Sequence, residues 1–571
     1  MFPDCFRPTA ETKYRVTRCV HGGVTVRTVP LPPPMTPLPP EIPFELNPTG
    51  AARPPVVRYR FAVPDRFLGR SLRPDATAFG LHLSAGWTVA VGLMLFGVVW
   101  LLHLNATALS APVDNIEQLI WVRSLEWGYH KHPPVPTWLL WLPVRLLGLN
   151  AWTSYLLGAT VTLTAMGVLW SLVRRLRGTA HANVALLATL CITYYSGRLN
   201  YYNHNVVLLL AAVASAACCW RAFEEKRLRW WLALGVVLGL GALSKYQIAL
   251  TALTVVCFWI TQRGWRERVH VRGLVLAAGV AVLVTLPHVA WLVAYDFAPI
   301  RYAMKMSLGI NLGPAERVSS AVDWVVDQLL NRSLPAFILL ALCMRRIARV
   351  PARPDAEATR PTSPLPMPPP DPARALLLCW AGVPLICVPA LALVFGSELQ
   401  LQWGTAFAPF VAAAAMELFR PRGGWSQVRM IYLLTCFVVV EGVLLTVNLV
   451  TSPAGIDAFK QHHWRSFPSA ALADRIAGPA RAKLGGPIRV VIGTTGIAGA
   501  LALRLPERPL VLLDGDLRTS PWVGRDRVRD CGALELVSDP SARGDATPVG
   551  PDFPALHWRV IQPATGASRC V

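Results

Sequence analysis

Long apolar stretches recur along most of the chain and are separated by short polar connections. A bilayer core about 30 Å thick needs about 20 apolar residues per helix, and runs of this length are rare in soluble proteins. We therefore expect an all-α polytopic membrane domain over residues 81–450. The pattern predicts about eleven spans, at approximately 84–103, 152–172, 182–200, 203–220, 230–246, 247–261, 273–294, 322–344, 375–395, 404–419 and 429–450.

The pattern changes after residue 450, where charges of both signs return and apolar runs become short. It predicts a strand, a helix and a second strand, in that order, at 488–492, 496–505 and 510–513. Such an alternation is typical of a small α/β domain, which we expect over residues 451–571.

The first 80 residues hold no secretory signal peptide, because the first long apolar run begins too late. They are rich in proline around residues 30–40, which predicts a disordered arm. A second proline-rich tract, 361–372, is interpreted as a flexible insertion between two spans.

Composition supports a membrane protein. The chain of 571 residues is 53% apolar and 15% charged, whereas soluble chains are about 25% charged. Lys and Arg number 55 against 33 Asp and Glu, a net charge of +22. An excess of positive charge of this size is typical of proteins that bind nucleic acid or an anionic membrane. Because the chain also has long apolar runs, we expect membrane lipids, and no nucleic acid, as its partner.

The basic residues also predict an orientation. Five connections each carry three or more Lys or Arg, at 174–177, 221–229, 263–272, 345–374 and 420–429. Basic connections stay in the cytoplasm, so the N-terminal arm is expected there. An odd number of spans then puts the C-terminal domain outside, in a multi-pass protein of the bacterial plasma (inner) membrane. Oxidation is permitted outside, and we predict a disulfide between Cys531 and Cys570, the two cysteines of that domain.

The first outer connection, 104–137, concentrates ionisable residues. Asp114 and Glu117 share one helix face at a spacing of three, and Lys131 and His132 follow just before two prolines. A carboxylate can act as general base, while a cation and an imidazole can hold a phosphate leaving group. The alternative is a solvated interfacial helix that Asp114 caps.

An activated group on the outer face has to arrive on a lipid carrier, because neither nucleotide sugars nor ATP are supplied there. Polyprenyl phosphate is the simplest such carrier. No cofactor is expected, since the glycines 493, 496 and 499 depart from the spacing of a dinucleotide-binding turn. No metal is expected either, because the chain has no CxxC pair.

The stretch 114–134 resembles the first outer loop of glycosyltransferase family 39, which includes protein O-mannosyltransferases and the lipid A aminoarabinose transferase. Further similar segments follow in the family's order, at 239–246, 287–297, 402–404 and 508–522. The resemblance covers roughly 80–571 and implies a GT-C fold with a polyprenyl-phosphate sugar donor.

The resemblance also implies residue roles. Asp114 matches the catalytic acidic position, and Glu117 is expected to act as the second acid although Asn115 stands directly after Asp114. The expected donor-phosphate ligands are Lys131, His132 and Lys245, and for Lys245 snorkelling to the membrane surface is the alternative. Expected contacts to the sugar or the acceptor are Tyr129, His130, Asn203, His204, Asp296 and Arg301. Capping of a helix is the alternative for Asn203 and His204, and ordinary placement at the membrane interface is the alternative for Asp296 and Arg301.

The predicted function is sugar transfer from a polyprenyl-phosphate donor to an acceptor on the outer face. The acceptor is an envelope glycolipid such as lipid A, a polysaccharide, or a protein hydroxyl. The alternatives are a polytopic transporter or lipid-linked sugar flippase, and a membrane scaffold whose outer domain binds a partner.

Overall fold

We describe the protein from a computed structural model. The described residues are 85–348, 371–421, 424–460, 464–538, 545–564 and 570. The predicted arm, 1–80, and nearly all of the second proline-rich tract, 361–370, lie outside them.

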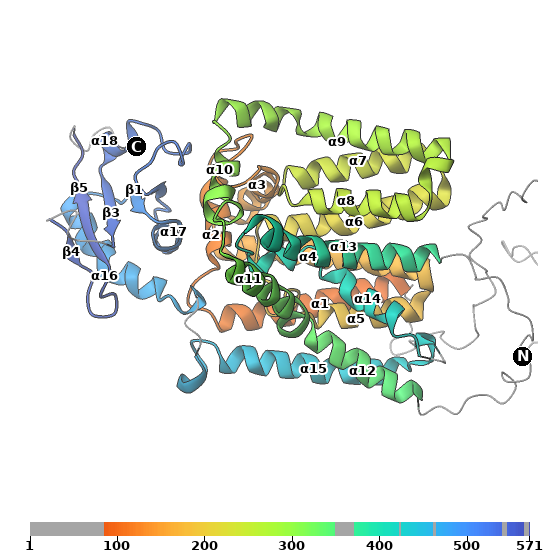
Figure 1. The fold of residues 1–571 in the computed structure, drawn as a ribbon. Helices are drawn as coiled ribbons and strands as arrows, with labels where there is room; N and C mark the ends of the chain where they lie inside the picture. Colours follow the sequence, from red (N-terminus) through yellow and green to blue (C-terminus); the bar gives the residue numbers. More distant parts are fainter. Residues whose placement is uncertain are drawn as a thin grey trace, which may run out of the picture. The chain divides into compact units, whose positions relative to one another are not determined.

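The described residues between 85 and 450 are mostly helical (Figure 1). The α-helices of this part are α1 (Ala85–Ala106), α2 (Val113–Trp121), α3 (Val135–Leu147), α4 (Ala151–Arg177), α5 (Thr179–Leu190), α6 (His204–Glu225), α7 (Leu228–Ala242), α8 (Ile248–Thr261), α9 (Arg268–Ala294), α10 (Ala298–Ala303), α11 (Pro314–Val326), α12 (Leu334–Ala348), α13 (Pro372–Phe395), α14 (Pro409–Leu418) and α15 (Met430–Val450).

Within the described residues, six helices are long and apolar enough to cross a membrane, namely α1, α4, α6, α9, α13 and α15. A seventh span results if α11, the π-helical turn η4 (Asp327–Arg332) and α12 count as one broken span, bent by 52°. The predicted count of eleven is therefore not confirmed. Several of the apolar stretches are interrupted: the one at 182–200 is helical only to Leu190, where α5 ends and turns begin.

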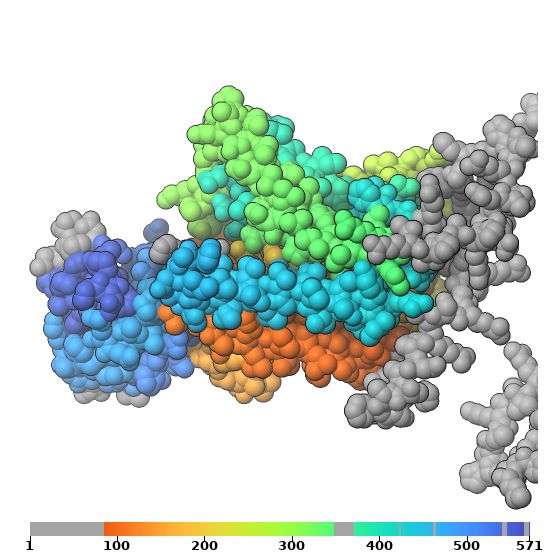
Figure 2. Space-filling view, turned by 90° about the horizontal axis from the view of Figure 1, so that it is seen from below, coloured from red at the N-terminus to blue at the C-terminus, as the bar shows by residue number. Residues whose placement is uncertain are grey.

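The long helices expose large apolar side chains. On α9, the relative exposure is 69% for Val275, 65% for Leu283 and 64% for Val293. Figure 2 shows α15 lying along α1 on one face of the molecule; Phe96 of α1 and Phe437 of α15 are in ring contact, with centroids 6.2 Å apart. Apolar surface on this scale is unfavourable in water and favourable against lipid chains, so the helices fit a multi-pass membrane protein.

Close helix packing depends on small residues. α7 packs along α9 and α6, and a Cβ on Gly235 of α7 would lie 2.6 Å from the carbonyl oxygen of Ala277 on α9. Glycine at this position lets the two backbones approach, as is common between membrane helices.

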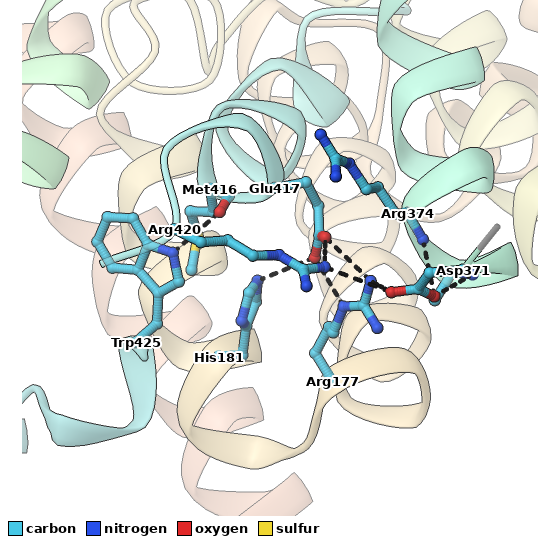
Figure 3. A network of polar contacts seen from close by, with 9 residues as sticks. Arg177, His181, Asp371, Arg374, Met416, Glu417, Arg420 and Trp425 are labelled. Carbon is cyan, nitrogen blue, oxygen red and sulfur yellow. Dashed lines mark hydrogen bonds and ion pairs between the residues drawn. The ribbon is translucent and has the colours of Figure 1, made fainter. Parts of the chain in front are cut away.

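An ionic network joins α4, α13 and α14 (Figure 3). Arg177, near the end of α4, donates to Glu417 at 2.7 Å and to Asp371 at 2.5 Å. Arg420 pairs with both carboxylates, and His181 Nε2 lies 3.8 Å from Glu417 Oε1. The Glu417 side chain is fully buried, so its two guanidinium partners compensate a charge that water does not reach.

The C-terminal segment contains a five-stranded sheet with the strand order β2-β1-β3-β5-β4. β1 runs parallel to β2 and β3, whereas β5 is antiparallel to β3 and β4. β1, α17 and β2 stand where the sequence predicts a strand, a helix and a strand. The elements are α16 (Ser469–Leu484), β1 (Val490–Gly493), α17 (Thr495–Arg504), β2 (Leu510–Leu513), α18 (Arg527–Cys531), β3 (Ala533–Val537), β4 (Thr547–Pro548) and β5 (His557–Ile561).

This segment lies at the α2 end of the helices and packs on α2 through α17 (Figure 1). A Cβ on Gly499 of α17 would lie 2.3 Å from Cγ2 of Ile116 on α2. Arg504 Nη2 donates to the carbonyl of Leu109 at 2.8 Å. A disulfide joins Cys531 to Cys570. The C-terminal segment thus packs against the connection at 104–137, mainly on α2.

Candidate functional site

The site is built around Asp114 in the first turn of α2. Asp114 Oδ2 accepts a hydrogen bond of 2.7 Å from Asn203 Nδ2. The N-cap of α2 is Pro112, and no side chain caps the helix, so the capping role considered for Asp114 is not observed. A carboxylate in the first turn is favoured by the helix dipole. Asp114 is partly exposed and has one fixed hydrogen-bond donor.

Asn115, directly after Asp114, is fully buried and fixes the backbone around it. Its Nδ2 donates to Ser154 Oγ at 2.9 Å and to the carbonyl of Asn200 at 2.8 Å. Its Oδ1 accepts from the Tyr202 amide at 2.9 Å. Because a carboxylate cannot donate, an aspartate here would leave both acceptors without their partner. The side-chain amide of Asn115 therefore stabilises the local structure at this position.

Glu117 lies one turn after Asp114 and pairs with Lys131 at 2.7 Å. Burial raises the pKa of the Glu117 carboxyl, and Lys131 opposes that shift in part. Burial disfavours the charge on Lys131, yet Glu117 and other neighbours outweigh it and raise the Lys131 pKa. The Nζ of Lys131 also lies 5.4 Å from the ring centroid of Tyr302, a cation–π contact. The ion pair between Glu117 and Lys131 therefore fixes both side chains near Asp114.

Two imidazoles and a second lysine complete the group. The rings of His132 and His204 have centroids 3.6 Å apart, and burial, followed by the charges of Lys245 and Lys131, holds the His132 pKa well below its usual value. Lys245 Nζ donates to Asn205 Oδ1 at 2.6 Å.

Asp114 interacts electrostatically with both Lys131 and Lys245. We call this group the Asp114 cluster: Asp114, Glu117, Lys131, His132, Asn203, His204 and Lys245. It combines two carboxylates, two lysines, two imidazoles and an amide. Burial lowers the pKa of Lys245 to about 7, and the charge of Asp114 opposes that shift.

Asn203 has two partners at once. Its Oδ1 accepts from the amides of Asn205 and Val206 and so caps α6, while its Nδ2 binds Asp114. The capping considered for Asn203 is therefore observed, together with a hydrogen bond to Asp114 that the sequence did not predict, and its contact to the sugar stays a prediction.

Other predicted residues lie outside the cluster. Tyr129 stacks on Trp121 with centroids 4.7 Å apart and donates to the carbonyl of Ser124, which makes it part of the loop's packing. Asp296 and Arg301 are exposed and form an ion pair with each other. No described contact connects that pair with Asp114.

His130 contacts the edge of Trp121, at a centroid distance of 5.7 Å. Burial lowers its pKa to about 4, Lys131 lowers it further, and Asp516 of the C-terminal segment opposes the shift. The lowered pKa favours a neutral His130 ring, which is near enough to both Lys131 and Asp516 for their charges to act on it.

Sequence reasoning missed a cavity of about 330 Å³ beside the start of α2. Its basic residues are Arg198, Arg332 and Arg465, which are far apart in the chain and have no shared motif. It also missed Glu441 of α15, which is buried and accepts a hydrogen bond of 2.9 Å from Trp100. Glu441 could have been found from the sequence, because an acidic residue inside an apolar span is energetically costly and usually indicates a functional or pairing role.

Within the described residues, no group of three or more His, Cys, Asp or Glu is arranged to hold a metal ion.

Comparisons with known proteins identify a similar family, similar sequences and a similar fold. Residues 131–291 match the model of a family described as dolichyl-phosphate-mannose-protein mannosyltransferase. The chain is 25% identical over 322 residues to the lipopolysaccharide core galacturonosyltransferase RgtB of Rhizobium johnstonii, covering 56% of this chain and 61% of RgtB. It is 24% identical over 241 residues to the lipid A galacturonosyltransferase RgtD of the same organism, covering 40% of this chain and 48% of RgtD.

The fold is also similar to a solved structure, that of ArnT from Cupriavidus metallidurans bound to undecaprenyl phosphate. The match covers 84% of this chain and 98% of ArnT, with a TM-score of 0.56 and 15% identity. These findings confirm the resemblance to GT-C glycosyltransferases and the mostly helical, ArnT-like fold. The chain spans about three fifths of RgtB and about half of RgtD.

Proposed function

We propose that this protein is a polytopic membrane glycosyltransferase that moves one sugar from a polyprenyl-phosphate donor to an acceptor on the outer face of the bacterial inner membrane. The observation that carries the proposal is the Asp114 cluster, in which a hydrogen-bonded carboxylate interacts with two lysines. The relatives are named as glycosyltransferases, and ArnT was crystallised with undecaprenyl phosphate.

In the proposed reaction, Asp114 is the general base. It takes the proton of the acceptor hydroxyl as the oxygen of that hydroxyl attacks the anomeric carbon of the sugar. The bond between this carbon and the phosphate oxygen breaks, and polyprenyl phosphate leaves with the electron pair. The Asn203 amide holds the Asp114 carboxylate by one oxygen, which leaves the other oxygen for the incoming proton.

Lys131 and Lys245 are proposed to bind the donor phosphate and to stabilise the charge that it gains as the bond breaks. The neutral rings of His132 and His204 can donate further hydrogen bonds. Glu117 keeps Lys131 charged and in place through the 2.7 Å ion pair, which makes Glu117 a positioning residue in this proposal.

An envelope glycolipid is the proposed acceptor, because RgtB and RgtD are named for lipopolysaccharide core and lipid A. In the proposed orientation, the N-terminal arm (1–80) is cytoplasmic. The first outer connection and an α/β domain at 451–571 face outward. The packing of α17 on α2 supports a common side for these two parts.

The function can be tested in two steps. Mass spectrometry of envelope lipids from a deletion strain should show the loss of one sugar mass, which names the sugar and the acceptor. The purified protein should then transfer that sugar from its polyprenyl-phosphate donor, and Asp114→Asn should reduce turnover by about 100-fold or more, the range expected for a lost general base.

The matched control is Asp474→Asn, which makes the same chemical change at an exposed position of α16 and should leave turnover unchanged. Wild-type turnover in Asp114→Asn would remove Asp114 from the mechanism. Movement of labelled donor lipid across vesicles without transfer would instead indicate a flippase.

A further inference from the structure

A second cavity, of about 260 Å³, lies between the C-terminal segment and the helices on which it packs. Its walls come from the end of α1, the loop at 108–111, the starts of α4 and α16, and α17 with the turn after it. Ile116 of α2 also lines it, and Asp114 stands two residues earlier on the same helix. Two residues turn a helix by about 200°, so the cavity and Asp114 lie on different sides of α2.

Three arginines gather at this cavity. Arg504 and Arg508 line it, and Arg123 Nη2 donates to the carbonyl oxygen of Arg508 at 2.7 Å. No Asp or Glu is among the described residues that line the cavity. The acid next to Arg508 in the chain, Glu507, pairs with Arg481 at 2.6 Å. The cavity therefore has a positive wall.

The arginines act on one another's charge. Arg504 donates to neutral oxygen atoms, the carbonyl of Leu109 at 2.8 Å and Ser469 Oγ at 3.0 Å. Burial, followed by the charge of Arg504, lowers the pKa of Arg508. Burial, followed by the charge of Arg508, lowers the pKa of Arg123. Cations that disfavour one another in this way favour the binding of an anion between them.

One hydrogen-bond donor at the cavity has no partner. Nη1 of Arg508 is buried, and no described group accepts a hydrogen bond from it. Buried polar atoms of folded proteins nearly always have a partner, so this atom indicates a ligand that can accept a hydrogen bond. A phosphate oxygen accepts from a guanidinium group and also compensates its charge.

The cavity lies at the ends of two helices of membrane-spanning length, α1 and α4, which pack on each other. Asn105 in the last turn of α1 and Trp152 in the first turn of α4 both line it. One turn further into each helix, Leu102 is 59% exposed and Leu156 is 43% exposed. Tryptophan is enriched at membrane interfaces, and exposed leucines on a spanning helix face lipid chains.

We propose that this cavity binds the phosphate of an anionic phospholipid from the membrane leaflet at the α2 end of the helices. Arg504 and Arg508 bind the phosphate, Trp152 contacts the glycerol region, and an acyl chain continues along Leu102 and Leu156. A free phosphate would leave this apolar surface uncovered, so a lipid is the occupant. The bound lipid connects α17 to α1 and α4 and attaches the C-terminal segment to the membrane. It takes no part in the transfer of a sugar.

The test uses the delipidated full-length protein in detergent, native mass spectrometry, and phosphatidylglycerol as the probe. Arg508→Gln should weaken binding of one phosphatidylglycerol about tenfold or more, because the unpartnered donor and its charge are lost. The control Arg525→Gln removes the same charge at an exposed position of the same segment and should bind like wild type. Without lipid, both variants should unfold at the wild-type temperature.

Two further arms identify the ligand. Phosphatidylcholine, whose headgroup has no net charge, should bind at least about tenfold more weakly than phosphatidylglycerol. Inorganic phosphate should not displace phosphatidylglycerol at an equal concentration, because it lacks the chain. Equal binding of the two lipids would overturn the anionic headgroup, and displacement by phosphate would overturn the lipid. Equal phosphatidylglycerol affinity of Arg508→Gln and wild type would overturn the site.

Hydrogen exchange shows where the lipid binds. Because the lipid contacts α17, phosphatidylglycerol should slow amide exchange of 495–504 in wild type and in Arg525→Gln, but not in Arg508→Gln. Equal slowing in Arg508→Gln and wild type would overturn the role of Arg508. None of these measurements uses sugar transfer. A protein that binds phosphatidylglycerol through Arg508 and transfers no sugar would overturn the proposed function and support this site.

Discussion

The amide of Asn203 donates a hydrogen bond of 2.7 Å to Asp114, while the carbonyl oxygen of the same side chain caps α6. One residue thus begins a membrane-spanning helix and orients the carboxylate of a neighbouring helix. The two tasks use different atoms, so a substitution can remove one and keep the other.

Asn203→Ser should impair transfer while preserving the fold. Serine is a good N-cap residue, but its short hydroxyl does not reach Asp114 while it caps α6. We expect kcat to fall about tenfold or more, as when a carboxylate loses the group that orients it, with a melting temperature close to that of wild type. Turnover with the lipid-linked donor and thermal unfolding in detergent measure the two effects.

Asn203→Ala is the companion variant, because it removes both the cap of α6 and the hydrogen bond to Asp114. It should lose as much activity as Asn203→Ser and also lose about 1 kcal/mol of stability from the missing cap. If Asn203→Ser turned over at the wild-type rate, the hydrogen bond to Asp114 would have no part in the reaction.

Lys131→Met should change how stability depends on pH. Burial raises the pKa of Glu117, and Lys131 is the main influence that lowers it; without Lys131 the pKa rises further. The folded state then binds a proton that the unfolded state releases, so stability falls as pH rises from about 4.5, the ordinary value, through the folded-state pKa. Thermal unfolding from about pH 4 to 8 should show a steeper decline for Lys131→Met than for wild type.

The double variant Glu117→Gln/Lys131→Met is the control for that measurement. It has no titrating carboxyl at this position, so the additional pH dependence should disappear. Parallel curves for wild type and Lys131→Met would mean that Glu117 does not depend on Lys131 for its ionisation.

The sequence predicted the local part of the site better than its long-range part. Asp114 and Lys131 belong to one connection and were recognisable there, since chemistry-bearing residues lie close together in a short, otherwise apolar stretch. The bond from Asn203 to Asp114 depends on how α6 meets α2. Arg332 and Arg465 line the same cavity as Arg198 only because of how the chain packs, and their spacing in the sequence does not predict this proximity.

The helical fold was predictable from apolar runs, but the length of each helix was not. Hydropathy treats 182–200 as one span, yet α5 ends at Leu190. The hydroxyls of Tyr194 and Tyr195 then bind the carbonyls of Leu401 and Thr405. These tertiary hydrogen bonds stabilise turns in an apolar stretch, and composition alone does not reveal them.

Glu417→Gln should destabilise the ionic network that joins α4, α13 and α14 (Figure 3). Glu417 is fully buried and pairs with Arg177 and Arg420. A neutral amide leaves these two cations with less compensation, which costs about 3 kcal/mol for a broken buried pair. Denaturation by heat in detergent should show a clear loss for this variant.

Asp371→Asn is the matched change within the same network. The Asp371 side chain is 37% exposed, and asparagine still caps α13 by accepting from the amides of Ala373 and Arg374. It should cost less than about 1 kcal/mol, as for a solvent-screened pair. Equal losses from the two substitutions would contradict the assignment of the buried charge to Glu417.

Gly499→Ala should loosen the contact between α17 and α2 and thereby lower transfer without touching the Asp114 cluster. The added Cβ would lie 2.3 Å from Cγ2 of Ile116 and 2.8 Å from Cδ1 of Ile120, so either α17 or α2 has to move. Because α2 also carries Asp114, two residues before Ile116, a displacement of about 1 Å should cost as much as 100-fold in kcat. Gly478→Ala is the control, since its Cβ meets no atom within 4 Å and alanine favours a helix by about 1 kcal/mol. Hydrogen exchange of 113–121 should rise in Gly499→Ala and stay at the wild-type level in Gly478→Ala. Normal exchange and turnover in Gly499→Ala would show that the C-terminal segment does not position α2.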